Sequence, residues 1–116
     1  MPPPPPAPLR ALVDLLGVPG TLALLEAHAG TRLYVAKTPG AAMVSLLGAE
    51  AAAALAGAMG GDYLHVPSAK RWRAILYRAR GESYARIARR LGIDENSVGR
   101  YLREAGVTRR QMELEI

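Results

Sequence analysis

Hydrogen-bonding side chains gather between residues 95 and 100, near the carboxyl end of the chain. They are Glu95, Asn96, Ser97 and Arg100, and on a helix Asn96 and Arg100 would share one face because they are four residues apart. In the major groove of DNA, Asn suits adenine, Arg suits guanine, Glu can accept from cytosine, and Ser is less selective. We therefore interpret these residues as candidates for reading DNA bases, with Ser97 the weaker one.

Positive charge is concentrated in the same part of the chain. Residues 68–116 contain twelve basic and six acidic residues, a net charge of +6, whereas residues 1–67 contain three basic and four acidic residues, a net charge of −1. This asymmetry favours a module that binds a polyanion, attached to a nearly neutral region. The alternative is a soluble surface that is merely rich in arginine.

Contacts with DNA phosphates would add affinity and salt dependence without sequence selection. We expect a few of the arginines in this region to be ordinary surface residues instead. The candidates for such contacts are Lys70, Arg71, Ser83, Arg86, Arg89, Arg90 and Arg103.

These candidates need a scaffold, and the pattern of residues 68–106 predicts three short helices. Ser68, Ser83 and Asp94 stand where N-caps are expected, and Gly81 and Gly92 stand where helices end. This spacing is typical of a helix-turn-helix, whose second helix enters the major groove. The alternative is a small helical bundle with a solvated basic face. The apolar residues predicted to face the core are Trp72, Ile75, Leu76, Ala79, Tyr84, Ile87, Ala88, Leu91, Ile93, Val98, Tyr101 and Leu102.

The first half of the chain contains an internal repeat with an offset of 31 residues. Residues 12–36 and 43–67 are identical at ten of 25 aligned positions, which include LLG and a later L-x-V. Each copy predicts a short apolar helix that ends in a left-handed cap at Gly17 or Gly48, then a second helix, then a short strand. Pro19 and Glu50 occupy equivalent early positions in the second helix of each copy.

Neither strand is expected to be stable alone, because unpaired strands are marginal in water. We expect the two strands to pair with each other, or with their copies in a second chain, while the helices bury their Leu and Ala faces. The apolar side chains assigned to dimerisation are Leu15, Leu16, Leu24, Leu33, Val35, Leu46, Leu47, Leu55, Leu64 and Val66.

The predicted fold class is therefore mainly α with short β-strands. The predicted organisation is a proline-rich tail (1–8), a duplicated helix-helix-strand region for assembly or dimerisation (9–67), a three-helix helix-turn-helix domain (68–106) and a tail (107–116).

Other residue patterns point away from catalysis and from membranes. The chain has no cysteine, and His28 and His65 stand apart without the spacing of a metal site. We find no paired carboxylates, Ser–His arrangement or phosphate-binding loop, so we expect no enzyme, no cofactor and no metal. The uncharged run 38–49 is shorter than the roughly 20 residues of a membrane span, and MPPPPPAP lacks signal-peptide features. We expect a cytoplasmic protein of a bacterial host, with no membrane partner.

Two stretches, GGDYLHVP and SYARIARRLGIDENSVGRYL, resemble the Mor transcription activator family of phage regulators, and the resemblance covers most of residues 9–104. It implies a phage or prophage activator that works with host RNA polymerase as a homodimer, with two helix-turn-helix units on an interrupted repeat in double-stranded DNA. It also implies that Tyr63 and His65 lie close to the minor groove. The duplication departs from this family: if the two strands pair within one chain, the region is a candidate pseudo-dimer.

Two other functions stay open at this point. The first is a phage structural or packaging DNA-binding protein, similar to a small terminase, in which the repeats build a ring. The second is an accessory protein of a recombinase or transposase that binds the ends of an element. The number of copies in the assembly separates a ring from a dimeric regulator.

Overall fold

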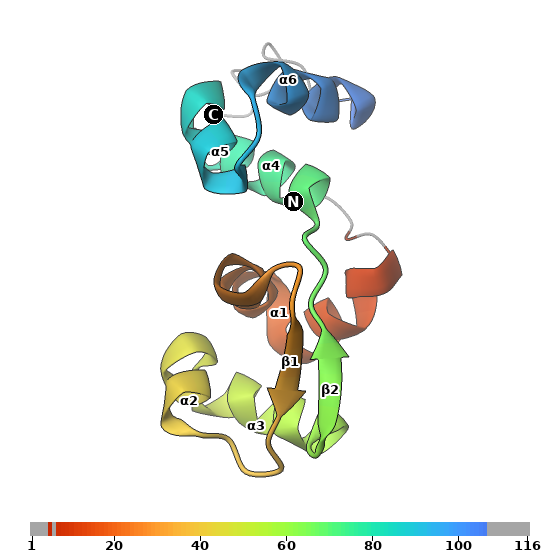
Figure 1. Cartoon of the computed structure of the whole chain (residues 1–116), viewed down its shortest axis with the longest axis vertical. Coiled ribbons are helices and arrows are strands. Elements are labelled where there is room, and N and C mark those ends of the chain that lie inside the picture. Colours follow the sequence, from red (N-terminus) through yellow and green to blue (C-terminus); the bar gives the residue numbers. More distant parts are fainter. Residues whose placement is uncertain (1–4, 6, 107–116) are drawn as a thin grey trace. The chain divides into compact units, whose positions relative to one another are not determined.

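The computed structural model describes residue 5 and residues 7–106. Within these residues the chain forms six helices and one two-stranded sheet, which confirms the predicted fold class (Figure 1). The predicted tail 107–116, and most of the predicted tail 1–8, lie outside the described residues. The elements are α1 (Ala7–His28), β1 (Arg32–Val35), α2 (Ala41–Leu47), α3 (Ala49–Met59), β2 (Asp62–His65), α4 (Lys70–Ala79), α5 (Tyr84–Leu91) and α6 (Glu95–Glu104).

The chain divides into two compact units between Ala69 and Lys70. The first unit contains α1 to β2, and the second contains α4 to α6. Within the described residues no single helix is long and apolar enough to cross a membrane. Only the pair α2 and α3, bent by 117°, passes that test, by length and composition alone.

The internal repeat of the sequence is repeated in the backbone of the first unit. Gly17 interrupts α1 with φ +72° and ψ +171°, and Gly48 separates α2 from α3 with φ +87° and ψ +159°. The predicted left-handed cap is therefore wrong, because ψ is extended although φ is positive. This region of φ and ψ is almost restricted to glycine. The same residue type thus interrupts the helix at the equivalent position of each copy.

The two strands pair with each other within one chain. β1 and β2 are antiparallel (Figure 1). Their register places Leu33 opposite Leu64 and Tyr34 opposite Tyr63. This settles one of the alternatives that the sequence leaves open, since no second chain is needed to pair either strand. The hydrogen bond from the Val66 amide to the Thr31 carbonyl, at 2.9 Å, extends the pairing by one position.

Leucine side chains form the core of the first unit. Of the residues assigned to dimerisation, Leu16, Leu24, Val35, Leu55 and Val66 are buried inside this single chain. The other five, which are Leu15, Leu33, Leu46, Leu47 and Leu64, are half-buried. Their role in a dimer stays a prediction, and the buried five hold the two copies of the repeat together.

The second unit has the predicted three helices, and α5 and α6 have the predicted caps. The Ser83 hydroxyl accepts the Arg86 amide at 3.2 Å, and the Asp94 carboxylate accepts the Ser97 amide at 2.7 Å. Gly92, at φ +67° and ψ +36°, ends α5 in the left-handed conformation that glycine adopts without a steric penalty. These local interactions fix the turn between α5 and α6.

Two details at α4 differ from the prediction. The helix begins at Lys70, so the position before it belongs to Ala69, with φ +48°, and not to Ser68. Ala79, predicted to face the core, is exposed at the end of the helix. The buried face instead includes Arg73 and Tyr77 together with the predicted Trp72.

Candidate nucleic-acid interface

The candidate base-reading residues lie on the first two turns of α6. Glu95 and Asn96 are exposed and Ser97 is half-buried, while Val98 and Leu102 on the opposite side are buried in the core of the unit. Packing of that apolar side leaves Asn96 and Arg100, four residues apart, on the solvent face of the helix. The structure thus provides one exposed face on which these two residues stand together.

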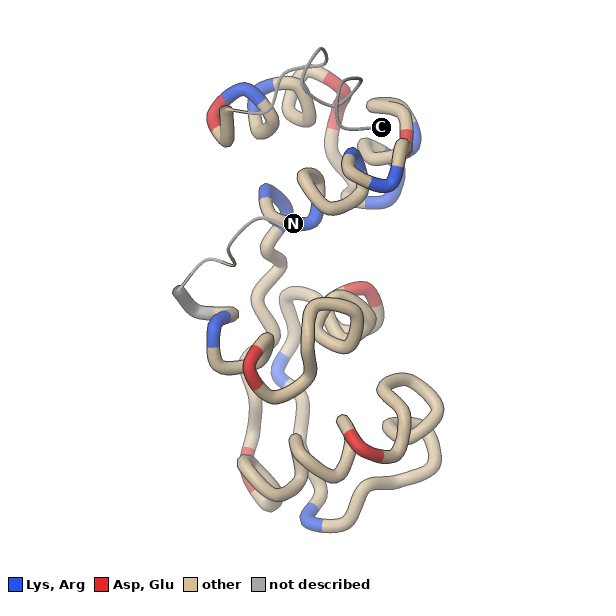
Figure 2. The backbone as a smooth tube through the Cα atoms, turned by 180° about the vertical axis from the view of Figure 1, so that it is seen from behind, with Lys and Arg blue, Asp and Glu red and all other residues tan. Residues whose placement is uncertain are grey.

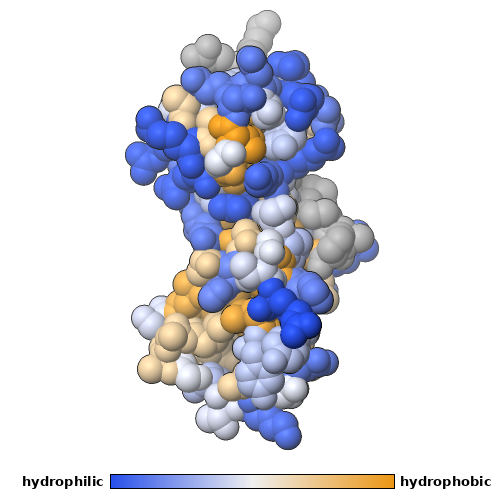
Figure 3. Space-filling model, viewed as in Figure 1, coloured by the Kyte–Doolittle hydropathy of each residue, from blue (hydrophilic) through white to orange (hydrophobic). Residues whose placement is uncertain are grey.

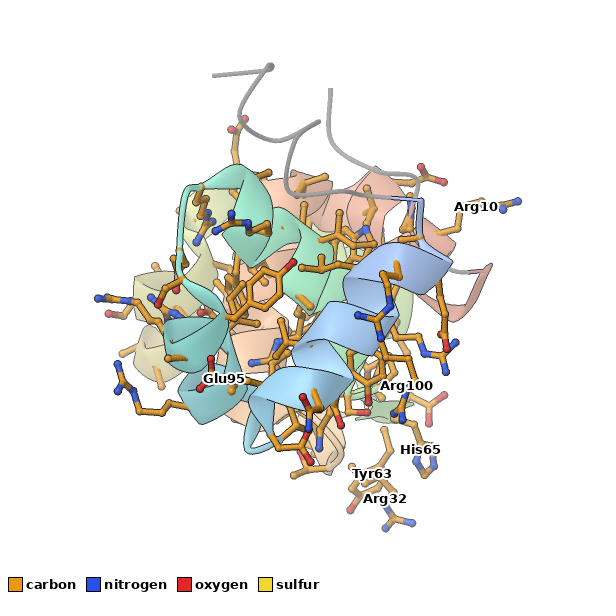
Figure 4. All side chains as sticks on the ribbon, turned by 90° about the horizontal axis from the view of Figure 1, so that it is seen from above. Arg10, Arg32, Tyr63, His65, Glu95 and Arg100 are labelled. Atoms are coloured by element: carbon orange, nitrogen blue, oxygen red, sulfur yellow. The ribbon has the colours of Figure 1, made fainter. Side chains whose placement is uncertain are left out.

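Arg100 and Glu95 project in different directions from α6. Figure 4 shows Arg100 extending away from the helix and Glu95 turned toward α5. Glu95 lines a hollow of about 340 Å³ with Arg78, Ser83 and Tyr84. The side chain of Arg100 is 56% exposed and its Cζ lies 5.5 Å from the centre of the Tyr101 ring. Nε of Arg100 also lies 3.9 Å from a carboxylate oxygen of Glu104, so a contact with DNA would compete with this long, exposed ion pair.

Gly99 is buried on α6 beside Arg103, one of the predicted phosphate contacts. A Cβ atom at this position would lie 3.1 Å from Nη1 of Arg103 and 3.8 Å from the Tyr84 ring. The Arg103 guanidinium is the end of a flexible, exposed side chain, so an alanine here would require only a small shift of that group.

Several of the candidate phosphate contacts are engaged within the second unit. The Glu82 carboxylate pairs with Arg86 at 3.3 Å and with Arg90 at 2.5 Å, and the Arg90 guanidinium also lies 5.0 Å from the Tyr77 ring. Arg71 pairs with Glu104 at 3.0 Å. These contacts fix the orientation of the guanidinium groups, and they oppose any contact with phosphate that would displace the carboxylate.

Two other candidates lie open to solvent. Arg89 and Arg103 are exposed, and neither has an ion pair in the part of the chain that the structure describes. Lys70 is half-buried at the beginning of α4, and Ser83 is exposed at the N-cap of α5. Figure 2 shows the Lys and Arg residues concentrated along the helices of the second unit.

A buried cluster of arginine and tyrosine lies behind this surface and was not predicted. Arg73 is only 7% exposed, and its Nε and Nη2 each donate to the Tyr77 hydroxyl at 3.3 Å. Tyr77 is fully buried, with the guanidinium of Arg80 6.0 Å from its ring. The sequence indicates this contact only through the spacing of four residues between Arg73 and Tyr77, which places both on one face of a helix.

The exposed face of the sheet carries a second group of polar and aromatic side chains. Tyr63 and His65, predicted to lie near the minor groove, share this face with Arg32 and Tyr34. The two tyrosine rings meet edge to face at 5.3 Å, and the Arg32 guanidinium lies 4.2 Å from the centre of the Tyr63 ring (Figure 4). Strand alternation and the pairing register together place these four residues on one side. Arg32 and Tyr34 were not predicted because the register was unknown.

An apolar hollow lies on the other side of β1, against α2 and α3. It has a volume of about 260 Å³, and Gly40, Met43, Leu55 and Ala56 contribute to its wall. No residue of α2 is buried, and Figure 3 shows apolar side chains gathered on this part of the surface. In the described part of the chain, no three His, Asp or Glu residues gather as a metal site would require.

Comparison with known families finds a match for one of the two units. Residues 66–110, which include α4, α5 and α6, match a family described as a homeodomain-like domain. No curated protein and no solved structure matches the chain. The family match covers well under half of the sequence, and it agrees with the capped helix–turn–helix of α5 and α6. The carboxyl-terminal part of this protein is therefore similar to a homeodomain-like domain, and this similarity, together with the helix-turn-helix of α5 and α6, supports a DNA-binding role for this part.

Proposed function

We propose that this protein is a sequence-specific DNA-binding transcription regulator. The observation that carries the proposal is the exposed face of α6, where Asn96 and Arg100 stand four residues apart on the second helix of the helix-turn-helix. In this motif the residues near the start of that helix reach base edges in the major groove. Each side chain that forms paired hydrogen bonds with its base would favour that base over a wrong one by about 1–3 kcal/mol.

The remaining basic residues would hold the domain on the DNA backbone. Arg89 and Arg103 are the strongest candidates, because both are exposed and have no ion pair within the described residues. Arg71, Arg86 and Arg90 would have to share their guanidinium groups with Glu82 or Glu104. The mechanism is binding, and we propose no catalytic step.

The resemblance to the Mor family would add activation together with a host RNA polymerase and a phage or prophage origin. The exposed group Arg32, Tyr34, Tyr63 and His65 supports a contact of the sheet with DNA, because it combines positive charge with aromatic rings. The homodimer that the resemblance also implies has less support, because β1 already has β2 as its partner within the same chain.

Selection of DNA duplexes from a random pool by the purified full-length protein, followed by sequencing, tests the proposal. We expect enrichment of a defined motif that persists when the salt concentration is raised. Retention of duplexes without any preferred sequence, which collapses as salt rises, would contradict base reading and favour a packaging or architectural role. A motif found only at the ends of mobile elements would favour the recombinase accessory.

A further inference from the structure

The two copies of the repeat contact each other through matching pairs of residues. The Gly30 amide donates to the Val66 carbonyl at 2.7 Å, and the Gly61 amide donates to the Val35 carbonyl, also at 2.7 Å. Gly61 and Val66 stand 31 residues after Gly30 and Val35, which is the offset of the repeat. Each copy therefore gives the other the same hydrogen bond that it receives.

The register of the sheet follows the same exchange. Leu33 pairs with Leu64, and these two residues are equivalent in the repeat. On either side of it, Arg32 pairs with His65 and Tyr34 pairs with Tyr63. Arg32 is equivalent to Tyr63 and Tyr34 is equivalent to His65, so exchanging the two copies turns one pair into the other. Such mutual contacts define an approximate two-fold axis through the Leu33–Leu64 pair. They have the isologous form that identical subunits show in a symmetric dimer.

Two pairs of equivalent core residues follow the same two-fold relationship. Leu24 and Leu55 are equivalent, and both are fully buried. Val35 and Val66 are also equivalent, and both are almost fully buried. A single copy would have one strand without a partner, so the second copy completes the sheet. Little of this interface is left for a second chain.

The structure assigns residues 9–67 as a dimerisation unit joined in tandem, so that each chain contains its own partner. Only the second copy leads into a helix-turn-helix, since β2 is followed by α4, whereas β1 is followed by α2. The two copies of the repeat together are therefore followed by a single helix-turn-helix. On the basis of the proposed function, we infer that the protein binds DNA as a monomer and recognises one short, asymmetric site.

This inference differs in a measurable way from a dimeric regulator. Two helix-turn-helix units in a symmetric dimer bind half-sites about 34 Å apart, in an inverted repeat. A single small module buries only about 600–1,000 Å² of protein surface on DNA. We therefore expect the selected motif to lack an inverted repeat, and binding to rise with protein concentration without cooperativity.

Cysteine cross-linking tests whether the strands pair within one chain. The protein has no cysteine of its own, and Arg32 and His65 lie directly opposite each other on adjacent strands. Oxidation of the full-length variant with Arg32→Cys and His65→Cys should give a disulfide within one chain, because facing positions on paired strands lie within its reach. On a denaturing gel without reductant, the product should migrate as a 12.4 kDa species. A covalent dimer would overturn the assignment of a tandem unit.

Sedimentation of the wild-type protein with its selected duplex tests the binding mode. We expect one chain per duplex and a motif without two-fold symmetry. Two chains on an inverted repeat would overturn monomeric recognition, even though base reading would be upheld. If no motif is selected, the proposed function fails, while the cross-link and the mass of the free protein still decide whether the chain contains its own partner.

Discussion

Glu82 accepts a hydrogen bond from Nε of Arg90 at 2.5 Å, and the two residues stand eight positions apart in the chain. The same carboxylate oxygen lies 3.3 Å from Nε of Arg86, and the Glu82 side chain is only 12% exposed. One carboxylate thus links the beginning of α5 with its last turn and holds two guanidinium groups that were predicted to contact phosphate.

Replacement of the Glu82 carboxylate should lower the stability of the fold and, at the same time, raise the affinity for DNA. We expect Glu82→Gln to lower the free energy of unfolding by about 1 kcal/mol, a value usual for partly exposed ion pairs. It should also raise the affinity for DNA of any sequence, because the Glu82 carboxylate no longer competes with phosphate for Arg86 and Arg90. Chemical unfolding and DNA titration at low salt measure both. Asp14→Asn on the exposed side of α1 removes the same charge and serves as the control. Equal effects of the two substitutions would contradict a specific role for Glu82.

Arg100 and Arg89 should contribute to different aspects of DNA binding. Arg100→Ala should reduce the preference for one base pair of the selected motif by about 1–3 kcal/mol. Arg89→Ala removes the same charge and should weaken binding to all sequences equally, with a decrease of about 0.9 in the salt slope. Competition titrations with single-base variants of the motif distinguish them. An unchanged preference in Arg100→Ala would remove this residue from base reading.

Asp94 should make the second unit sensitive to acid. The Ser97 amide hydrogen bond, which contributes most, and the Ser97 hydroxyl and Arg100 charge hold the pKa of Asp94 below its ordinary value. Because the folded state lowers this pKa, the cap stabilises the fold above the unfolded pKa of about 3.9 and is lost as the pH falls through the folded value. Asp94→Asn keeps an N-cap but cannot titrate there.

Unfolding of the wild type and of Asp94→Asn across the acid range tests this dependence. The difference in stability between the two proteins should shrink as Asp94 becomes protonated. Asp14→Asn is the matched control for the loss of one carboxylate. A constant difference between wild type and Asp94→Asn at every pH would show that the cap hydrogen bond does not depend on the charge.

Two glycines near each other in sequence should respond to alanine in opposite directions. Gly48 has φ +87°, and Gly57 lies inside α3, while neither has a neighbouring atom within 4 Å of an added Cβ. Gly48→Ala should lower the free energy of unfolding by about 1–3 kcal/mol through backbone strain alone. Gly57→Ala should raise it by up to about 1 kcal/mol through helix propensity. Urea unfolding gives both values, and the same sign for both would contradict the strain.

Local sequence patterns were sufficient to predict much of the second unit. Ser83, Gly92 and Asp94 act within a few residues of their own positions, so their residue types indicated the caps that the structure contains. Arg73 could not be placed in this way. Its burial depends on the hydroxyl of Tyr77 and on the packing of three helices, and a charged residue is otherwise expected at the surface.

The repeat predicted the elements of the first unit but not the partner of each strand. Pairing within one chain or between two chains places the same side chains on the same face, so alternation along Arg32–Val35 could not distinguish them. The register decides which residues become neighbours, and it depends on the whole unit. Tyr63 and His65 were candidates through the family resemblance, whereas their neighbours Arg32 and Tyr34 could be assigned to the same face only once the register was known.

The hollow beside α2 has a consequence for how the two copies of the repeat can evolve. Ala56 lines that hollow, whereas its equivalent in the first copy, Leu25, is fully buried. Gly40 likewise stands where the first copy has Leu9, also fully buried. In a dimer of identical chains, every mutation alters both subunits, so a small residue would weaken both at once. In a tandem chain the two copies can change independently. The first copy can retain the leucines of the core, while the second replaces the equivalent residues with smaller ones and forms the hollow.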